Sequence, residues 1–472
     1  MKLTFWGACR QVTGSMFHLE LEDGYTLLID CGMDMENAQE PQPHYPGSTF
    51  PFDASRVNTV LLTHAHIDHS GKIPNLLRED FEGQVYCTPP TLALAELLLK
   101  DSASIHAKKL KTYHKNKYKS GKKKVEGNPA EWYVDKHVND SLRQFQGVDF
   151  NRKIKITPQL YATFIPTGHL LGAANILLEV EENGTWKKLL FSGDIGRNHY
   201  PLLSNPQTPP QVDYLICEST YGNRQHKSTD QSEEELEKVI QQACVETPGR
   251  LIIPAFSVGR TQAILYTLNK LYLQNRLPFI KIFADSPMAY QSNRIYERYA
   301  SFLNPESQAF KEQHQSLFNF DNLSYIEKTK DSRALSGYNA PCIIISASGM
   351  LEGGRIQHHI KSNINNPNCT ILMVGYVAEG TFGHDLLHKL KSLKVGSKEI
   401  PIAATIRQTD VFSGHGDLQD LLSFVGQQSP GTLQKLFLVH GEERSIQDFQ
   451  QTLSEKGYQQ IEVPERGQSF EL

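Results

Sequence analysis

The sequence predicts an α/β protein, because strand-like and helix-like segments alternate along its 472 residues. Apolar runs that end in polar residues recur along the chain, as buried strands do. These runs are Tyr25–Asp30, Val57–His64, Lys188–Asp194, Tyr214–Glu218, Leu251–Phe256, Cys342–Ser348, Thr370–Gly375 and Leu436–His440. Open α/β sheets bind ligands at the carboxyl ends of their strands, so we expect the functional residues there.

The composition is that of a globular protein, with 39% hydrophobic and 21% charged residues. The net charge of −4 gives no general sign of nucleic-acid binding, so any such surface must be local. The first residues, MKLTFWGACR, resemble a first strand rather than a signal peptide, and no apolar run is long enough to cross a bilayer. We therefore expect a cytoplasmic protein that does not bind membranes, with its seven cysteines reduced and mostly buried.

The strongest local signal is the segment HAHIDH at positions 64–69. His64, His66, Asp68 and His69 place four potential metal ligands directly after a strand-like run. Imidazole nitrogens and carboxylate oxygens suit Zn²⁺ or Mn²⁺. Several such groups that lose their hydration together need a cation to compensate them. The segment therefore predicts a metal site.

Further candidate ligands lie at other strand-like ends. Asp30, Asp194 and His440 each close an apolar run, and His169 lies between two such runs. Taken alone, each of these residues is better explained as a turn or cap residue. Together with the HAHIDH segment they complete the ligand set of a site for two metal ions, which can share a water and clamp a reacting group.

These motifs resemble the metallo-β-lactamase fold over the length from Asp30 to His440. The resemblance implies an αββα sandwich of two mixed β-sheets flanked by helices. It also implies two Zn²⁺ ions per chain, with Mn²⁺ as a substitute. It assigns His64, His66 and His169 to the first metal, Asp68, His69 and His440 to the second, Asp194 to both, and Asp30 to a position behind the ligands that it orients.

A long insertion separates this sequence from single-domain proteins of that fold. Asp194 and His440 lie 246 positions apart, too far for a structureless loop, and the intervening segments carry α/β signals of their own. The arrangement resembles the β-CASP subfamily of nucleic-acid hydrolases. The matching segments are CESTYGNR, PAFSVGRTQ, DSPMA, SASGMLEGGR, GYVAEGTFG, FSGHGD and LVHGE. We expect an inserted β-CASP domain at 208–400, a metallo-β-lactamase domain from 1–207 and 401–472, and a linker at Pro201–Pro210.

The resemblance implies a compact bacterial ribonuclease that acts in RNA processing or decay. The expected reaction is endonucleolytic hydrolysis of RNA phosphodiester bonds, with 5′-to-3′ exonuclease activity left open. His440 in the last motif favours RNA over DNA. Asp68, Glu218 and His415 are the expected catalytic residues. His415 would act as general acid or phosphate contact, and Glu218 would orient it through a charge-assisted hydrogen bond.

Other residues are candidates for contacts with the phosphates of RNA. The backbone N–H groups of Ser348 and Gly349 lie in a glycine-rich turn that could cradle a phosphate. Arg260 and Arg355 follow glycines at expected helix starts and could fork onto phosphate, with structural salt bridges as the alternative. Residues 108–124 contain nine lysines and no carboxylate, and form either an RNA-contacting arm or a solvated helix or loop.

Two other functions stay open at this point. A small-molecule hydrolase of the same fold would have a similar metal site, but it has no use for the inserted domain. A non-catalytic subunit of a processing complex would have lost ligands, whereas every ligand position here is filled. The sequence leaves open the RNA target and whether the protein is a monomer or a homodimer.

Overall fold

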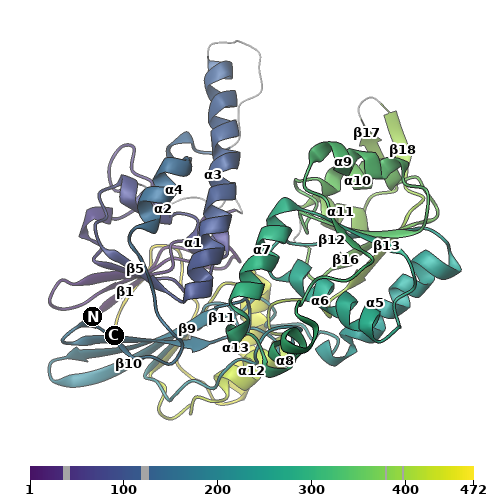
Figure 1. Cartoon of the computed structure of the whole chain (residues 1–472). Coiled ribbons are helices and arrows are strands. Elements are labelled where there is room, and N and C mark those ends of the chain that lie inside the picture. Colours follow the sequence, from purple (N-terminus) through teal and green to yellow (C-terminus); the bar gives the residue numbers. More distant parts are fainter. Residues whose placement is uncertain (36–42, 118–126, 378–379, 396–397) are drawn as a thin grey trace. The chain divides into compact units, whose positions relative to one another are not determined.

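The structure, a computed structural model, describes residues 1–35, 43–117, 127–377, 380–395 and 398–472. The chain divides into two compact units: unit 1 is Met1–Gly196, Pro206–Gln225 and His415–Leu472, and unit 2 is Arg197–Asn205 and His226–Gly414. Both units combine strands and helices, which confirms the predicted α/β class (Figure 1). In the described part of the chain we find no helix with the length and apolar character that a bilayer span requires.

Unit 1 contains two seven-stranded mixed sheets. The first runs in the order β22 (Ser469–Glu471), β1 (Lys2–Phe5), β2 (Phe17–Glu20), β3 (Thr26–Ile29), β4 (Thr59–Leu61), β5 (Gln84–Cys87), β6 (Phe145–Gly147). The second runs in the order β21 (Ile461–Glu462), β20 (Lys435–Val439), β11 (Tyr214–Glu218), β10 (Thr185–Phe191), β9 (Ala174–Glu182), β8 (Leu160–Pro166), β7 (Ile154–Thr157). In the first sheet, the neighbours in the run β3, β4, β5, β6 pair in parallel. In the second sheet, the neighbours in the run β10, β11, β20, β21 do so, and all remaining pairs are antiparallel.

A shared hydrophobic core lies between the two sheets. Phe5 of the first sheet and Phe437 of the second both belong to it, with ring centroids 5.1 Å apart. Along β9 the side chains alternate, so that Ile176 enters this core while Leu177 enters a cluster on the other face of the second sheet. That alternation follows from the two-residue period of a strand. The two sheets therefore pack face to face as a sandwich.

Helices cover the outer faces of this sandwich. Phe424 of α12 (Leu418–Val425) and Phe449 of α13 (Glu443–Glu455) are buried in the outer cluster of the second sheet. On the other side, α3 contacts β6 of the first sheet and packs against α1 and α4. The helices on that side are α1 (Ile67–Ser70), α2 (Ile73–Arg78), α3 (Pro89–Lys117) and α4 (Asp135–Leu142). This layering is the predicted αββα sandwich.

Unit 2 is built on a six-stranded, all-parallel sheet. Its strand order is β14 (Leu323–Tyr325), β13 (Lys281–Asp285), β15 (Cys342–Ser346), β12 (Arg250–Pro254), β16 (Cys369–Val374), β19 (Thr405–Thr409). A separate antiparallel pair joins β17 (Ser392–Val395) to β18 (Lys398–Pro401). The helices are α5 (Ser232–Ile240), α6 (Arg260–Leu273), α7 (Pro287–Arg298), α8 (Pro305–His314), α9 (Thr329–Ala334), α10 (Ile356–Asn363) and α11 (Phe382–His388). Unit 2 is thus an α/β unit with its own sheet.

The chain passes from one unit to the other at residues that differ from the expected domain boundaries. β11 falls within the expected range 208–400, yet it pairs in parallel with β10 and β20 and so belongs to the second sheet of unit 1. β19 falls within the expected return segment, yet it pairs with β16 in unit 2. The expected linker Pro201–Pro210 contains one change of unit, between Asn205 and Pro206.

Candidate metal centre

All ten residues predicted for the metal site and its catalytic partners lie in unit 1, near the carboxyl ends of strands or at helix starts. They are Asp30 after β3, His64 and His66 after β4, Asp68 and His69 in α1, His169 between β8 and β9, Asp194 after β10, Glu218 at the end of β11, His415 before α12, and His440 after β20. Neighbouring parallel strands end at the same edge of a sheet. This topology is what gathers residues from distant parts of the sequence.

Two glycines permit the close backbone contacts at this edge. A Cβ atom on Gly32 would lie 1.7 Å from the carbonyl oxygen of Asp68. A Cβ atom on Gly196 would lie 2.1 Å from the carbonyl carbon of Gly168, the residue before His169. Any side chain at either position would displace a backbone segment at a candidate ligand.

The first donor set consists of His64, His66, His169 and Asp194. Nδ1 of His66 lies 3.0 Å from Nε2 of His64 and 3.2 Å from Nε2 of His169. Both of these Nε2 atoms lie 3.4 Å from Oδ2 of Asp194. Tetrahedral zinc ligands at bond lengths of about 2.0 to 2.1 Å are separated by about 3.3 to 3.4 Å. The donor atoms therefore have the spacing of a tetrahedral zinc site.

The second donor set consists of Asp68, His69 and His440. Nε2 of His69 lies 3.4 Å from Nε2 of His440. Oδ2 of Asp68 lies 3.7 Å from Nε2 of His440 and 4.0 Å from Nε2 of His69. Oδ1 of Asp194 faces the same atoms, at 3.2 Å from Nε2 of His69 and 3.6 Å from Nε2 of His440.

Asp194 joins the two donor sets, since Oδ2 faces the first and Oδ1 the second. Its side chain is 2% exposed, and within the described part of the chain Oδ1 accepts no hydrogen bond. A buried carboxylate oxygen without such a partner is costly unless a cation compensates it. The donor types, their spacing and this oxygen all fit a metal ion, so the residues fit the predicted group.

The electrostatics of the cluster favour the protonation states that bind a cation. Burial lowers the pKa of His66 to about 4 and also lowers the pKa of His64, which keeps both imidazoles neutral. Burial raises the pKa of Asp194, but the imidazoles of His440 and His69 outweigh it and hold that pKa well below its usual value. Metal ligands must be neutral imidazoles or ionised carboxylates.

His69 is the exception among these imidazoles. Burial lowers its pKa, but the carboxylates of Asp194 and Asp30 outweigh burial and raise it well above the usual value. Nδ1 of His69 lies 2.7 Å from Oδ2 of Asp30, which also accepts a hydrogen bond from Oγ1 of Thr63 at 2.8 Å. Asp30 thus fixes the ring of His69 from behind, the arrangement by which carboxylates orient metal-binding histidines.

Glu218 and His415 lie beside Asp194. Nδ1 of His415 is 3.3 and 3.4 Å from the two carboxylate oxygens of Glu218, and its Nε2 is 3.8 Å from Oδ2 of Asp194. Burial lowers the pKa of His415, but the charges of Glu218 and Asp194 outweigh it and raise the pKa to about 8. The predicted pairing of Glu218 with His415 is therefore present, and it presents Nε2 toward Asp194.

Known protein families match three successive segments of the chain. Residues 11–159 match the metallo-beta-lactamase superfamily, residues 261–386 the Beta-Casp domain, and residues 399–464 the Zn-dependent metallo-hydrolase RNA specificity domain. Ribonuclease TTHA0252 of Thermus thermophilus is 32% identical over 458 residues, which cover 97% of either chain. The chain belongs to the β-CASP family. The resemblance predicted from its motifs is confirmed.

Two further relatives of this β-CASP protein come from Methanocaldococcus jannaschii. An RNase J-like protein is 28% identical over 454 residues, covering 96% of this chain and 95% of the relative. Transcription termination factor FttA is 30% identical over 479 residues, covering 98% of this chain and 70% of the relative. Both similarities extend over nearly the whole of this chain.

Two threonines in the β-CASP metal centre had no role in the sequence prediction. Oγ1 of Thr63 contacts Nδ1 of His64 at 3.1 Å, in addition to its bond with Asp30. Oγ1 of Thr220 lies 2.5 Å from Oε2 of Glu218 and 3.0 Å from Nδ1 of His440. Both residues are next to or near a predicted site residue in sequence, which is the only signal that could have indicated them.

The candidate phosphate contacts other than His415 lie in unit 2, and two of them are engaged within the protein. NH1 of Arg355 pairs with Oδ1 of Asp285 at 2.7 Å and also donates to the carbonyl oxygen of Ile326. The structural alternative is therefore favoured for Arg355. The N–H of Ser348 donates to the carbonyl oxygen of Gly353 at 3.2 Å, which occupies the donor expected to bind phosphate.

Arg260 and Gly349 keep the phosphate role as a prediction. The guanidinium carbon of Arg260 lies 4.8 Å from the ring centroid of Phe256. The same ring lies 3.1 Å from the position that a Cβ on Gly349 would take. Phe256 is 36% exposed, so this corner of unit 2 presents an aromatic ring and a guanidinium near solvent.

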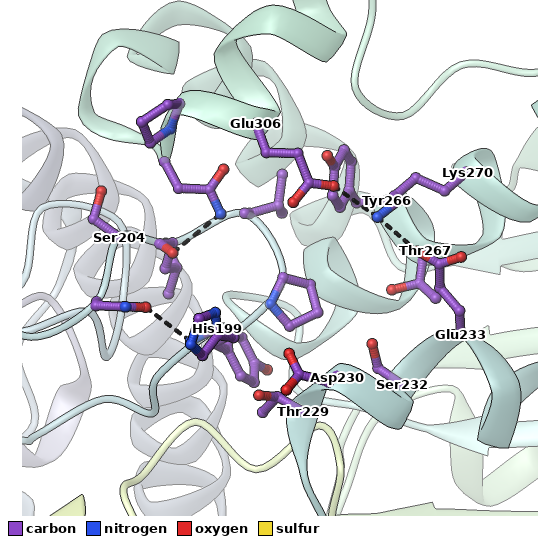
Figure 2. A pocket seen from close by; sticks show the side chains of 17 residues that line it. His199, Ser204, Thr229, Asp230, Ser232, Glu233, Tyr266, Thr267, Lys270 and Glu306 are labelled. Atoms are coloured by element: carbon purple, nitrogen blue, oxygen red, sulfur yellow. Dashed lines mark hydrogen bonds and ion pairs between the residues drawn. The ribbon is translucent and has the colours of Figure 1, made fainter.

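Unit 2 also contains a pocket of about 450 Å³ (Figure 2). Three of its charged groups pair with one another, because Nζ of Lys270 lies 2.6 Å from Oε1 of Glu233 and 2.7 Å from Oε1 of Glu306. None of the ten metal-centre residues lines this pocket. This pairing accounts for these three charged groups without a ligand.

Proposed function

We propose that this β-CASP protein is a zinc-dependent ribonuclease that hydrolyses the phosphodiester bonds of RNA. The observation that carries the proposal is the pair of donor sets joined by Asp194, with Glu218 and His415 beside it. The similarity to Ribonuclease TTHA0252 and to the RNase J-like protein supports RNA as the substrate. The matched RNA specificity domain supports it as well.

Two zinc ions per chain are part of this proposal, with Mn²⁺ as the substitute. We assign one ion to His64, His66 and His169, the other to Asp68, His69 and His440, and Asp194 to both. Bound there, the ions would supply a nucleophile from water at neutral pH and neutralise charge on the phosphate. Asp30 and Thr220 would hold His69 and His440 in their ligand orientations.

His415 supplies the acid function in this proposal. In the protonated form of His415, the carboxylate of Glu218 accepts the proton on Nδ1, and the second ring proton lies on Nε2 and faces Asp194. From there, His415 can neutralise a phosphate oxygen or deliver its Nε2 proton to the departing 3′-oxygen. Glu218 positions this ring and does not itself need to reach the substrate.

The test supplies the zinc-loaded protein with RNA labelled at either end, with or without a 5′-triphosphate, and separately with a chromogenic β-lactam. We expect RNA cleavage and no lactam hydrolysis. Internal fragments would identify endonuclease action, and mononucleotides would identify 5′-to-3′ exonuclease action. Lactam turnover without RNA cleavage would instead favour the small-molecule hydrolase.

The matched variants for this test are Asp68→Ala and Asp140→Ala. Asp68 belongs to the second donor set, so its loss is expected to abolish cleavage while the fold persists. Asp140 lies on α4, outside the cluster, and its loss is expected to leave cleavage unchanged. Cytoplasmic location and the oligomeric state, monomer or homodimer, stay predictions.

A further inference from the structure

The second half of α3 carries lysines that the proposed reaction does not use. Lys108, Lys111 and Lys115 are exposed, and their spacing of three and then four positions places them on one face of the helix. With a rise of 1.5 Å per residue, they span about 10 Å. We call these three residues the lysine face.

The lysine face forms no ion pair within the described part of the chain, although Asp101, seven positions before Lys108, interacts with it electrostatically. Earlier in the same helix, Lys100 pairs with Glu96 at 2.6 Å, one turn away. From position 102 to the end of α3 the sequence contains no carboxylate, and the three lysines form no ion pair with any described residue. Like charges three and four positions apart repel each other. The negative end of the helix dipole can stabilise the charge of Lys115 but is too far from Lys108 and Lys111. A polyanionic partner would offset the repulsion among the three lysines.

The helix that presents this face is anchored in unit 1. The ring of His106 packs edge-on against Tyr133, with centroids 4.6 Å apart, and both side chains are buried. One further contact joins Tyr113 to Trp132, with centroids 6.2 Å apart. The last turns of α3 extend beyond α2 and α4 of the same unit (Figure 1). The lysine face is therefore held on an ordered helix that leaves it open to solvent.

The other end of α3 lies beside the metal centre. Oγ1 of Thr91 donates to the carbonyl oxygen of Gly172 at 2.9 Å, in the loop that carries His169. Leu99 shares a hydrophobic cluster with Ile67 of α1, the helix that carries two ligands of the second donor set. The lysine face begins nine residues after Leu99, about 14 Å along the helix. A nucleic-acid strand at the metal centre could follow α3 to the lysine face.

We propose that the lysine face binds the phosphate backbone of the RNA substrate away from the bond that is cut. This inference rests on the proposed ribonuclease function. Ammonium groups that neutralise phosphates release counterions and so add affinity without sequence preference. The net charge of −4 means that the protein as a whole does not attract RNA, so the contact must come from a local basic surface of this kind.

The test compares two triple variants that change the net charge equally. K108A/K111A/K115A removes the lysine face, and alanine preserves the helix. K2A/K155A/K456A removes three exposed lysines from other parts of unit 1. Binding of a fluorescent single-stranded RNA is followed by anisotropy over a range of salt concentrations, in an Asp68→Ala background that leaves the RNA intact. Hydrolysis of bis(p-nitrophenyl) phosphate is measured for both triples with Asp68 in place.

We expect the first triple to lower the slope of log Kd against log salt by about two, since each single-strand phosphate contact contributes about 0.7. A fourfold reduction in salt should then tighten binding of the parent about twentyfold more than binding of this triple. The second triple should keep the parent slope. Hydrolysis of bis(p-nitrophenyl) phosphate should be unchanged in both, because this small substrate does not reach the lysine face.

An unchanged slope in the first triple, or an equal change in both, would overturn this inference. Loss of binding to phosphatidylserine vesicles with an unchanged RNA slope would also overturn it, and would assign the face to a membrane. If the wild-type protein cleaves RNA while the slope is unaffected, only this inference fails. If the wild-type protein neither binds nor cleaves RNA, the proposed function fails and this inference fails with it.

Discussion

The hydroxyl of Thr220 connects the acid pair to the second donor set. It can donate to Glu218 at 2.5 Å and accept the Nδ1 proton of His440 at 3.0 Å. A proton on Nδ1 leaves Nε2 of His440 as the donor atom for a metal. One side chain therefore sets both the tautomer of a ligand and the position of the carboxylate that holds His415.

We expect Thr220→Val to lower the zinc affinity of the second donor set or the rate of RNA cleavage by about 10- to 100-fold, the usual cost of losing such a partner. Thr220→Ser, which keeps the hydroxyl, should restore most of the loss. Zinc competition with a chromogenic chelator and the cleavage rate are the two readouts. Equal effects of valine and serine would show that Thr220 acts through packing alone.

His415→Ala should retain the metal content of the wild-type protein while losing most RNA cleavage. His415 belongs to neither of the two donor sets, although it forms a third group of potential donors with Glu218 and Asp194, and its proposed work is to neutralise phosphate and protonate the leaving oxygen. The loss should be smaller for bis(p-nitrophenyl) phosphate, whose leaving group needs no proton. The role assigned to His415 is wrong if the variant loses zinc or cleaves RNA at the wild-type rate.

At the scale of elements, β13 of unit 2 ends on a buried charge network. Asp285 accepts hydrogen bonds from His359 at 2.6 Å, from Arg355 at 2.7 Å and from Ser332. Burial raises the pKa of Asp285, but these three partners outweigh burial and lower it. The carboxylate thus links the strand to α10 and α9, which are distant in sequence.

We expect Asp285→Asn to destabilise the protein by about 3 kcal/mol at neutral pH, because it leaves Arg355 without its buried partner. The pKa of Asp285 is lower in the folded state, so its contribution is present above the unfolded pKa and is lost as pH falls through the folded value. The difference in the free energy of unfolding between variant and wild type should therefore become smaller below about pH 4.

Urea unfolding of the full chain at several pH values measures this effect. Asp321→Asn serves as the control, since Asp321 is an exposed residue that bonds only to the hydroxyl of Tyr272 among the described residues. It should shift the free energy of unfolding by no more than about 0.5 kcal/mol. A similar small shift for Asp285→Asn would show that the network contributes little.

The strands could be predicted because burial on both faces produces continuous apolar runs. The run Tyr214–Glu218 coincides with β11, and Leu251–Phe256 overlaps β12 within two residues. The assignment of β11 to a unit could not be predicted, since it depends on pairing with β20, more than 200 positions later. The ion pair of Arg355 could not be predicted either, because its partner Asp285 lies 70 positions away and no local sequence pattern connects the two residues.

The clustering of the candidate ligands could be predicted more completely than the residues that orient them. Reactive side chains at strand ends have a recognisable sequence pattern, and the sheet edge gathers them by topology. Hydroxyls such as those of Thr63 and Thr220 have no distinguishing pattern, because threonine at a strand end has many structural uses. Only their distances to Asp30 and Glu218 reveal what they do.

At the scale of the whole molecule, metal binding should stabilise the folded protein. Unfolding disperses both donor sets, so a cation that binds only the folded state shifts the equilibrium toward it. We expect removal of zinc by a chelator to lower Tm by several degrees, and readdition of Zn²⁺ to restore it. Mg²⁺ should not restore it, because imidazole ligands suit zinc and not magnesium. An unchanged Tm would show that the clusters hold no structural cation.

Titration of the metal-free protein with Zn²⁺, while cleavage of an end-labelled RNA is followed, tests the central claim most directly. The shared carboxylate of Asp194 and the two complete donor sets predict that cleavage rises until two zinc ions are bound per chain. They also predict that Asp194→Ala shows no cleavage at any zinc concentration. Full RNA cleavage by the metal-free protein, or cleavage complete at one zinc per chain, would contradict this account.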